Sequence, residues 1–235
     1  LPARSGLGSS STFTVSMLHA GYALLSKYAS KYNLAIQAID IEQNKIGEAV
    51  GSQDQTAAAF GGFNRINFGG VREIEVSPLI IPSEKLESLQ DNLLLFFTGF
   101  SRTASEVATE QIATLSEKEQ ELHKMMEICQ EAERLIVSDK DTIKDIGDLL
   151  NEQWKIKRNL TSKISNPEID SIYEKMINAG AIGGKLLGAG GGGFMLCFAD
   201  PENHEAIKSA LKDLLHVPFR FDFTGSQIIY HGEHI

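Results

Sequence analysis

A short run of glycine and hydroxyl residues leads directly into a long apolar pattern near the start of the 235-residue chain. Residues 6–12 read Gly-Leu-Gly-Ser-Ser-Ser-Thr. A helix that opens on such a loop presents unpaired backbone N–H groups at its positive end, and glycine lets a ligand approach that backbone closely. The pattern therefore predicts a phosphate site at the start of a helix. The apolar residues that recur at helical spacing are Phe13, Val15, Met17, Leu18, Tyr22, Leu25, Tyr28 and Ala29.

A simpler interpretation is that one hydroxyl residue in this stretch only caps the helix. One serine would be enough for a cap, whereas three serines and a threonine follow Gly-Leu-Gly, so we favour phosphate binding. The loop is not a Walker P-loop, because no Gly-Lys-Ser or Gly-Lys-Thr follows the glycines.

A second glycine-rich run lies far along the chain, where residues 188–193 read Gly-Ala-Gly-Gly-Gly-Gly. It contains Gly-x-Gly-x-x-Gly, but a dinucleotide-binding fingerprint follows a strand and opens a helix. Here we expect a helix before the glycines and a strand after them. Each glycine costs about 0.5–1 kcal/mol in regular structure. The run therefore predicts a close approach to another backbone or to a ligand.

The composition excludes several kinds of partner. With 22 basic and 31 acidic residues the formal net charge is −9, which argues against nucleic acid and anionic lipid as partners. The longest apolar run, 186–199, is shorter than the roughly 20 residues that span a bilayer, so we expect no membrane segment. Cys129 and Cys197 lie far apart in the sequence and predict reduced thiols in the core of a cytoplasmic protein, with a disulfide left open.

The rest of the chain mixes helical and strand patterns without a regular βαβ repeat, which indicates an α+β fold. Gly69-Gly70 is the expected hairpin turn, and Pro78 and Pro82 mark a domain boundary. We expect helices at 33–48, 56–59, 102–137, 142–158, 167–179 and 201–215, and strands at 63–76, 92–98, 194–198 and 219–223.

Both glycine-rich stretches also resemble known motifs. Residues 2–11 (Pro-Ala-Arg-Ser-Gly-Leu-Gly-Ser-Ser-Ser) resemble the second signature of the GHMP kinases, and residues 185–193 (Lys-Leu-Leu-Gly-Ala-Gly-Gly-Gly-Gly) resemble the third. In that family the first loop wraps the phosphates of ATP, and the other folds back over it and over the acceptor substrate. The resemblance implies that Gly190 also faces the acceptor, and that the ATP contacts come from Gly6, Leu7, Gly8, Ser9, Ser10, Ser11, Gly188, Gly190 and Gly191.

The resemblance implies a two-domain α+β fold, with an N-terminal part like domain 2 of ribosomal protein S5 and a ferredoxin-like C-terminal part. Residues 1–80 would be the remainder of the ATP-binding N-terminal domain, and residues 81–235 the C-terminal domain. The family's N-terminal strands and first signature have no counterpart here, because the sequence starts just ahead of the second signature. We therefore expect these strands to be missing and such a chain to be inactive or prone to aggregate by itself.

Phosphoryl transfer needs a cation beside the phosphates and often a base for the attacking hydroxyl. Asp54 and Glu42 are two of the first four carboxylates that follow the first loop in sequence. The resemblance assigns Asp54 as the base, and Ser10 and Glu42 as the ligands of Mg²⁺. From the residues alone, Asp54 is equally an N-cap of a helix that begins at Gln55, and Glu42 is a solvated helix residue.

Further segments resemble the sugar kinases of this family. Residues 97–105 are similar to the Thr-Gly-x-x-Arg segment of anomeric sugar kinases, while residues 50–55, 60–65 and 154–168 are similar to the D-glycero-D-manno-heptose 7-phosphate kinases. This implies transfer of the γ-phosphate of ATP to the C1 hydroxyl, giving heptose 1,7-bisphosphate for nucleotide-activated heptose. Such a substrate needs basic side chains to bind its own phosphate. Each candidate, taken singly, could equally be an ordinary surface charge on a long helix. The candidates are Arg102, Lys157, Arg158 and Lys163.

Two alternatives stay open at this point. The protein could be another anomeric sugar kinase of the fucokinase or galactokinase type, or a catalytically silent GHMP-fold sensor that binds sugar and nucleotide. Retention of Glu42 and Asp54 argues against the sensor. The expected partners are ATP and a small sugar phosphate, and the oligomeric state is open, with a homodimer as one candidate.

Overall fold

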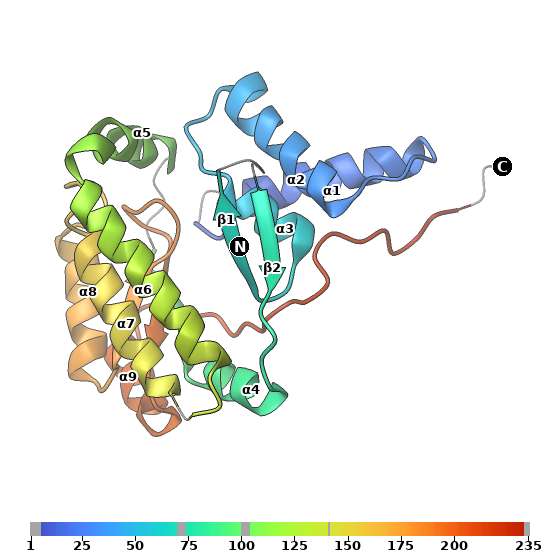
Figure 1. The fold of residues 1–235 in the computed structure, drawn as a ribbon. Helices are drawn as coiled ribbons and strands as arrows, with labels where there is room; N and C mark the ends of the chain where they lie inside the picture. Colours follow the sequence, from blue (N-terminus) through green and yellow to red (C-terminus); the bar gives the residue numbers. More distant parts are fainter. Residues whose placement is uncertain (1–5, 70–73, 100–103, 141, 233–235) are drawn as a thin grey trace. The chain divides into compact units, whose positions relative to one another are not determined.

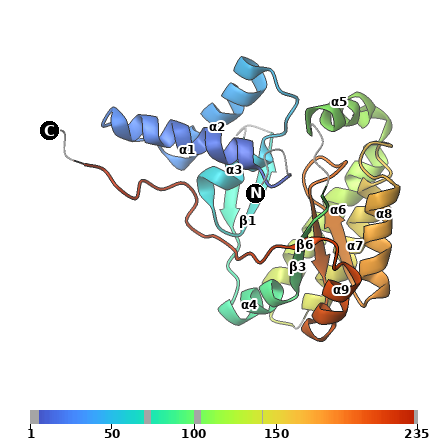
Figure 2. The same ribbon diagram turned by 180° about the vertical axis from the view of Figure 1, so that it is seen from behind.

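The computed structural model of the chain describes residues 6–69, 74–99, 104–140 and 142–232, with the backbone alone for 104–106 (Figures 1 and 2). The described residues divide into two compact units. Unit 1 contains Gly8–Pro78 and Phe221–Ile235, and unit 2 contains Leu79–Arg220 together with Gly6 and Leu7. The boundary between the units therefore falls inside the first glycine-rich loop, between Leu7 and Gly8. The segment from Phe221 onward belongs to unit 1, although we assigned it to a C-terminal domain at 81–235.

Unit 1 combines helices with one antiparallel hairpin (Figure 1). The helix predicted after the first loop is confirmed, but the helix predicted at 33–48 changes character, because a wider π-helix replaces the α-helix after Asp40. The helix predicted at 56–59 begins three residues earlier. The elements are α1 (Ser9–Leu24), α2 (Lys31–Asp40), η1 (Ile41–Ile46), α3 (Gln53–Phe60), β1 (Asn64–Phe68) and β2 (Ile74–Pro78).

The strands predicted over 63–76 are confirmed as the hairpin β1–β2, in which Phe68 lies opposite Ile74. Gly69 begins the connection with a φ of 93°, a conformation that favours glycine. The second residue of the predicted turn, Gly70, lies outside the described residues.

Small side chains let the helices of unit 1 pack closely. Ala35, Ala38 and Ala59 are completely buried and form a core with Leu34 and Val15. Of the apolar residues of α1, only Val15 is buried, whereas Phe13 is 66% exposed. The helical spacing therefore predicted the helix correctly but not which of its apolar side chains are buried.

Unit 2 holds a four-stranded sheet covered by helices (Figure 2). The long helix predicted at 102–137 is interrupted at 115–118, and the helix predicted at 201–215 ends at Ala210. The elements are α4 (Ser83–Asp91), β3 (Leu93–Phe97), α5 (Ala104–Thr114), η2 (Leu115–Glu117), α6 (Glu119–Val137), α7 (Ile143–Lys157), α8 (Pro167–Asn178), β4 (Gly183–Leu186), β5 (Phe194–Phe198), η3 (Pro201–Asn203), α9 (His204–Ala210) and β6 (Leu215–His216).

The sheet has the order β4-β5-β3-β6, and all neighbouring strands are antiparallel. Its apolar side chains, among them Phe96 and Cys197, share one core with Trp154 and Met176. We expected a helix directly before the second glycine-rich run, and this was wrong, because β4 precedes it. The run instead connects two antiparallel strands, β4 and β5, and still opens no helix, so it is not a dinucleotide-binding turn.

The strand predicted at 219–223 is also wrong, because these residues belong to no strand. The segment instead packs on the residues that follow α3. The N–H of Gly62 donates to the carbonyl oxygen of Asp222 at 2.8 Å, and the rings of Phe63 and Phe221 lie 5.5 Å apart. Phe221 and Asp222 therefore pack on unit 1 without strand pairing, whereas Phe219 belongs to unit 2.

Two further expectations concern the compartment. Both cysteines are free, but Cys129 is exposed on α6, so only Cys197 is a core thiol as predicted. Among the described residues, the helices are too short or too polar to cross a bilayer.

Candidate phosphate and metal site

The first glycine-rich loop shapes the start of α1. Gly8 is the N-cap residue, with a φ of 66° that places it in the left-handed region favoured by glycine. Ser9 and Ser10 follow in the first turn, where both are exposed. Because a glycine occupies the cap position, the hydroxyl residues cap nothing, and the capping interpretation is wrong. The first N–H groups of α1 are therefore left without a side-chain cap.

Within unit 2, the two glycine-rich loops touch backbone to backbone. A Cβ at Gly188 would lie 3.0 Å from the Cα of Gly6, and a Cβ at Gly6 would lie 3.3 Å from the carbonyl oxygen of Leu187. Both glycines also have positive φ angles, of 80° at Gly6 and 70° at Gly188. Side chains at either position would force the loops apart, so the glycines permit the close approach that the sequence predicted.

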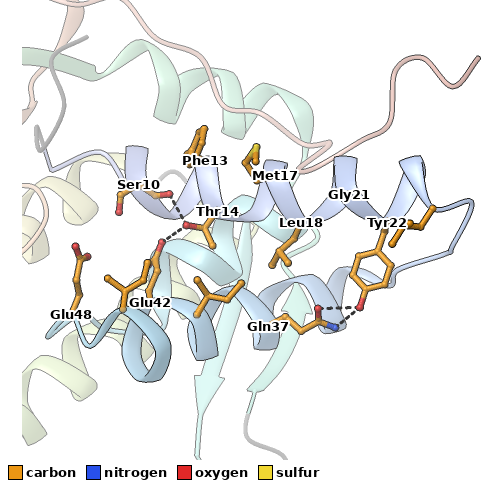
Figure 3. Close-up of a pocket in the computed structure, with 13 residues that line it drawn as sticks. Ser10, Phe13, Thr14, Met17, Leu18, Gly21, Tyr22, Gln37, Glu42 and Glu48 are labelled. Atoms are coloured by element: carbon orange, nitrogen blue, oxygen red, sulfur yellow. Dashed lines mark hydrogen bonds between the residues drawn. The ribbon is translucent and has the colours of Figure 1, made fainter.

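Glu42 is the centre of a buried hydrogen-bond cluster in unit 1, and Figure 3 shows the bond that it accepts from Thr14. The hydroxyl of Ser11 donates to its Oε2 at 2.9 Å, and the hydroxyl of Thr14 donates to its Oε1 at 2.8 Å. The Nε2 of Gln55 also donates to Oε2. With an exposed fraction of 2%, Glu42 is not the solvated helix residue of the simpler interpretation.

The π-helix η1 explains how Glu42 reaches this place. Its wider turn follows α2 without a break and ends at Ile46, and the C-cap residue Gly47 has a φ of 77°. Such π turns inside helices are often found at functional sites. Here the turn carries the carboxylate of Glu42 toward Ser11 and Thr14, which lie on one face of α1 because they are three residues apart.

The residues around Glu42 suit a hard cation. Mg²⁺ prefers oxygen ligands and commonly takes only one or two carboxylates, with water and phosphate oxygens filling the remaining positions. Ser10 and Glu42 line the same pocket, and a carboxylate has lone pairs beyond those that its hydrogen bonds use. Among the described residues, no group of three or more histidine, cysteine or acidic side chains is arranged to hold a metal ion.

Asp54 lies in the first turn of α3, where Ser52 is the N-cap residue, so Asp54 is not a cap. A Cβ at Gly8 would lie 3.2 Å from the Cβ of Asp54, which places the aspartate directly beside the start of α1. Desolvation by the surrounding atoms, and then the negative charge of Glu42, raise the pKa of Asp54. Because the residue itself is exposed, water screens part of this effect.

The remaining glycines of the second loop face the protein. Gly190 packs on the backbone of Ile164, where a Cβ would lie 2.7 Å from the Cα. The N–H of Gly191 donates to the carbonyl oxygen of Ile164 at 2.9 Å, and Gly193 exchanges hydrogen bonds with Thr98. The N–H of Gly191, one of the expected ATP contacts, is therefore already used inside unit 2, whereas Gly188 is exposed.

The expected sugar-phosphate cations differ in their surroundings. Arg158 forms an ion pair with Asp170 at 2.8 Å, and Lys163 forms one with Glu110 at 3.0 Å. Arg102 lies outside the described residues. Carboxylates thus partly neutralise Arg158 and Lys163, which makes these two residues weaker candidates for binding a substrate phosphate.

A pocket of about 630 Å³ opens beside the Glu42 cluster, within unit 1 (Figure 3). Ser10, Thr14, Glu42 and Glu48 form its polar end, and apolar side chains of α1 such as Met17 form its wall. The hydroxyl of Tyr22 and the amide of Gln37 are hydrogen-bonded to each other farther along α1.

Sequence reasoning missed Thr14, Gln55 and Lys185, whereas Lys157 was already among its candidate cations. The spacing of Ser11 and Thr14 on one helix face was the available signal, since both could then reach the same carboxylate. Gln55 directly follows Asp54, but nothing in the sequence indicates that its side chain turns inward and is completely buried.

Comparison with known proteins agrees with these motifs. The model of the GHMP kinases N terminal domain matches residues 1–62, and the model of the GHMP kinases C terminal region matches residues 138–217. The chain is 35% identical to a D-glycero-alpha-D-manno-heptose 7-phosphate kinase of Campylobacter jejuni, over 95% of this chain and 66% of that protein. It is 26% identical to the bifunctional fucokinase/GDP-fucose pyrophosphorylase of Arabidopsis thaliana, over 91% of this chain and 20% of that protein.

Among solved structures, a D-glycero-D-manno-heptose 1-phosphate kinase from Bacteriodes thetaiotaomicron matches with a TM-score of 0.76 and 27% identity, over 98% of this chain and 66% of that one. The chain therefore spans 66% of the length of the heptose 7-phosphate kinase and of this solved structure. Two family models match in the expected order along the sequence, and a relative with 35% identity aligns with nearly all of it. The chain belongs to the GHMP kinase family.

Proposed function

We propose that the protein is an ATP-dependent kinase that phosphorylates the C1 hydroxyl of D-glycero-D-manno-heptose 7-phosphate. The product would be the heptose 1,7-bisphosphate, a precursor of nucleotide-activated heptose. The observation that carries this proposal is the Campylobacter jejuni heptose 7-phosphate kinase, with 35% identity across 95% of this chain. The uncapped start of α1, with Glu42 and Asp54 close to it, supports a phosphoryl transfer chemistry.

The phosphates of ATP would bind at the first loop. The N–H groups of Ser9, Ser10 and Ser11 lie in the first turn of α1, at the positive end of the helix. Gly8 leaves the backbone open to the ligand, and Gly6 is held in place by its contact with Gly188. We therefore assign ATP binding chiefly to Gly6, Leu7, Gly8, Ser9, Ser10, Ser11 and Gly188. Gly190, which packs on Ile164, and Gly191, whose N–H is already bonded, would support the loop.

Asp54 would accept the proton of the C1 hydroxyl. A raised pKa makes a carboxylate a stronger base, which suits this role. Ser10 and Glu42 would hold Mg²⁺, which when bound neutralises charge on the phosphates. Ser11, Thr14 and Gln55 fix the orientation of the Glu42 carboxylate through their hydrogen bonds.

We also propose the assignment of residues 1–80 to an ATP-binding domain and of 81–235 to a C-terminal domain, with the tail from Phe221 packing on the first. The free thiols and the need for ATP fit a cytoplasmic enzyme. A homodimer is the assembly to test first.

The test is ATP consumption by the full-length protein with a panel of free and phosphorylated heptoses and hexoses. Asp54→Asn should retain ATP binding and reduce turnover about 10²–10⁴-fold, the usual contribution of a general base. Asp40→Asn is the matched control, because Asp40, the last residue of α2, pairs with Lys45 of η1 at 3.4 Å and has no proposed role. Near-normal turnover of Asp54→Asn would rule out Asp54 as the base.

The same panel distinguishes a heptose 7-phosphate kinase from an enzyme of the fucokinase type. The similarity to the Arabidopsis thaliana protein supports that alternative. A heptose 7-phosphate kinase should ignore neutral sugars, whereas an enzyme of the fucokinase or galactokinase type should use them. Absence of turnover with every sugar would instead favour a silent sensor.

A further inference from the structure

Lys157, at the end of α7, is attached directly to the second glycine-rich loop. Its Nζ donates to the carbonyl oxygen of Gly188 at 2.6 Å and reaches the carbonyl oxygen of Leu186 at 3.4 Å. The ammonium group therefore lies beside the exposed glycine that packs on Gly6. All of these residues belong to unit 2.

A second lysine lies close by on β4. The Nζ of Lys185 donates to Oε1 of Gln153 at 2.5 Å, and Gln153 is one helical turn before Lys157 on α7. Burial, and then the positive charge of Lys185, lower the pKa of Lys157 to about 7. Burial also lowers the pKa of Lys185. The two ammonium groups are thus near enough to repel each other in a poorly hydrated place.

Neither lysine forms an ion pair with a carboxylate among the described residues, and the thiol of Cys129 is the one acidic group whose charge acts on Lys185. Their hydrogen-bond acceptors are backbone carbonyls and one neutral amide. By contrast, Arg158 and Lys163, which the sequence favoured as phosphate ligands, each pair with a carboxylate. Two partly buried ammonium groups without an anion are unfavourable, and a bound dianion would offset that cost.

We propose that Lys157 and Lys185 form a phosphate-binding subsite beside Gly188, and that it takes the phosphomonoester of the sugar phosphate acceptor. Each ammonium group has N–H donors beyond those used by its protein partners, and lysine binds phosphate as a point charge. The proposal rests on the proposed kinase function for the identity of its ligand. The two lysines would distinguish a phosphorylated heptose from the unphosphorylated sugar.

The experiment compares Lys157→Met and Lys185→Met in the full-length protein. Lys155→Met is the matched control, because Lys155 is an exposed lysine in the same last turn of α7. Each test variant should raise the KM for heptose 7-phosphate about tenfold or more, as expected when a charge-assisted hydrogen bond is lost. The KM for ATP should stay within about twofold of wild type, and Lys157→Arg should recover part of the affinity for heptose 7-phosphate.

Other results would overturn the proposal. A rise in the KM for ATP alone would place a nucleotide phosphate at these lysines, and equal losses for both substrates would reduce Lys157 to a support for the loop. Unchanged KM values for heptose 7-phosphate and for ATP in both methionine variants would refute the proposed subsite. Should one variant fail to fold, as judged by thermal unfolding, the other lysine still tests the claim.

Calorimetric titration with inorganic phosphate, without nucleotide, separates this proposal from the kinase function. Wild type and Lys155→Met should bind phosphate, and both test variants should bind it at least about tenfold more weakly. That result would stand even if no sugar were phosphorylated, in which case the kinase function alone fails. Equal phosphate affinity in all variants would refute the subsite whatever the activity.

Discussion

Replacing Glu42 by leucine should destabilise the protein strongly, because two buried donors, from Ser11 and Gln55, and the half-buried hydroxyl of Thr14 point at its carboxylate. The hydroxyls of Ser11 and Thr14 can turn toward other acceptors, but the amide of Gln55 has less freedom. Its Oε1 is already buried without a partner among the described residues, and turning the amide over would place that oxygen against the carboxylate. Glu42 thus fixes the orientation of Gln55.

The magnitude follows from these partners. A buried donor left unpaired costs about 1–3 kcal/mol, and hydroxyl reorientation reduces that cost for two of the three groups. Removing a buried charge returns part of its desolvation penalty. We expect Glu42→Leu to lose about 2–5 kcal/mol, which for a protein of this size lowers the midpoint of thermal unfolding by roughly 5–15 °C. Glu42→Gln keeps the shape and one acceptor oxygen, so it should lose about 1–2 kcal/mol.

The assay is thermal unfolding of the purified variants at pH 7, followed by circular dichroism. Glu48→Gln is the matched control, because Glu48 lines the same pocket but is exposed. It should stay within about 0.5 kcal/mol of wild type. A leucine variant as stable as wild type, or a Glu48 variant that loses as much as Glu42→Leu, would refute the idea that Glu42 organises this cluster.

Two further predictions concern the second loop. Gly188 has a φ of 70°, and Gly188→Ala would place a Cβ 3.0 Å from the Cα of Gly6. We expect this variant to raise the KM for ATP about tenfold or more. Gly51→Ala is the control, because Gly51 has open space around it, and the KM for ATP should not change. Because the pKa of Lys157 is about 7 in the folded protein and about 10.5 when unfolded, the unfolded chain binds the extra proton between these values. Stability should therefore rise as the pH increases from 7 toward 10.5, and Lys157→Met should flatten that slope in unfolding midpoints measured at pH 7 and pH 9. An unchanged slope in the variant would show that Lys157 is not the titrating group.

The local pattern of the sequence was enough to predict most elements. Helical spacing predicted α1, the aromatic run predicted β3, and Pro167 with the apolar pattern after it predicted α8. The prediction of an element failed where two different structures produce the same local pattern. The alternating aromatics at 219–223 read as a strand, but the chain there packs on Gly62 and Phe63 without pairing.

The candidate site divides in the same way. The sequence by itself determined that two glycine loops allow close backbone approach, and that an acid lies soon after the first helix pair, because backbone conformation and residue type are local properties. Only the tertiary structure decided that Ser11, Thr14 and Gln55 surround Glu42, that Gly191 is already bonded, and that Lys157 rather than Arg158 lacks a carboxylate partner. Burial and the choice of partner depend on segments that meet only after folding, and a one-dimensional pattern does not contain those distances.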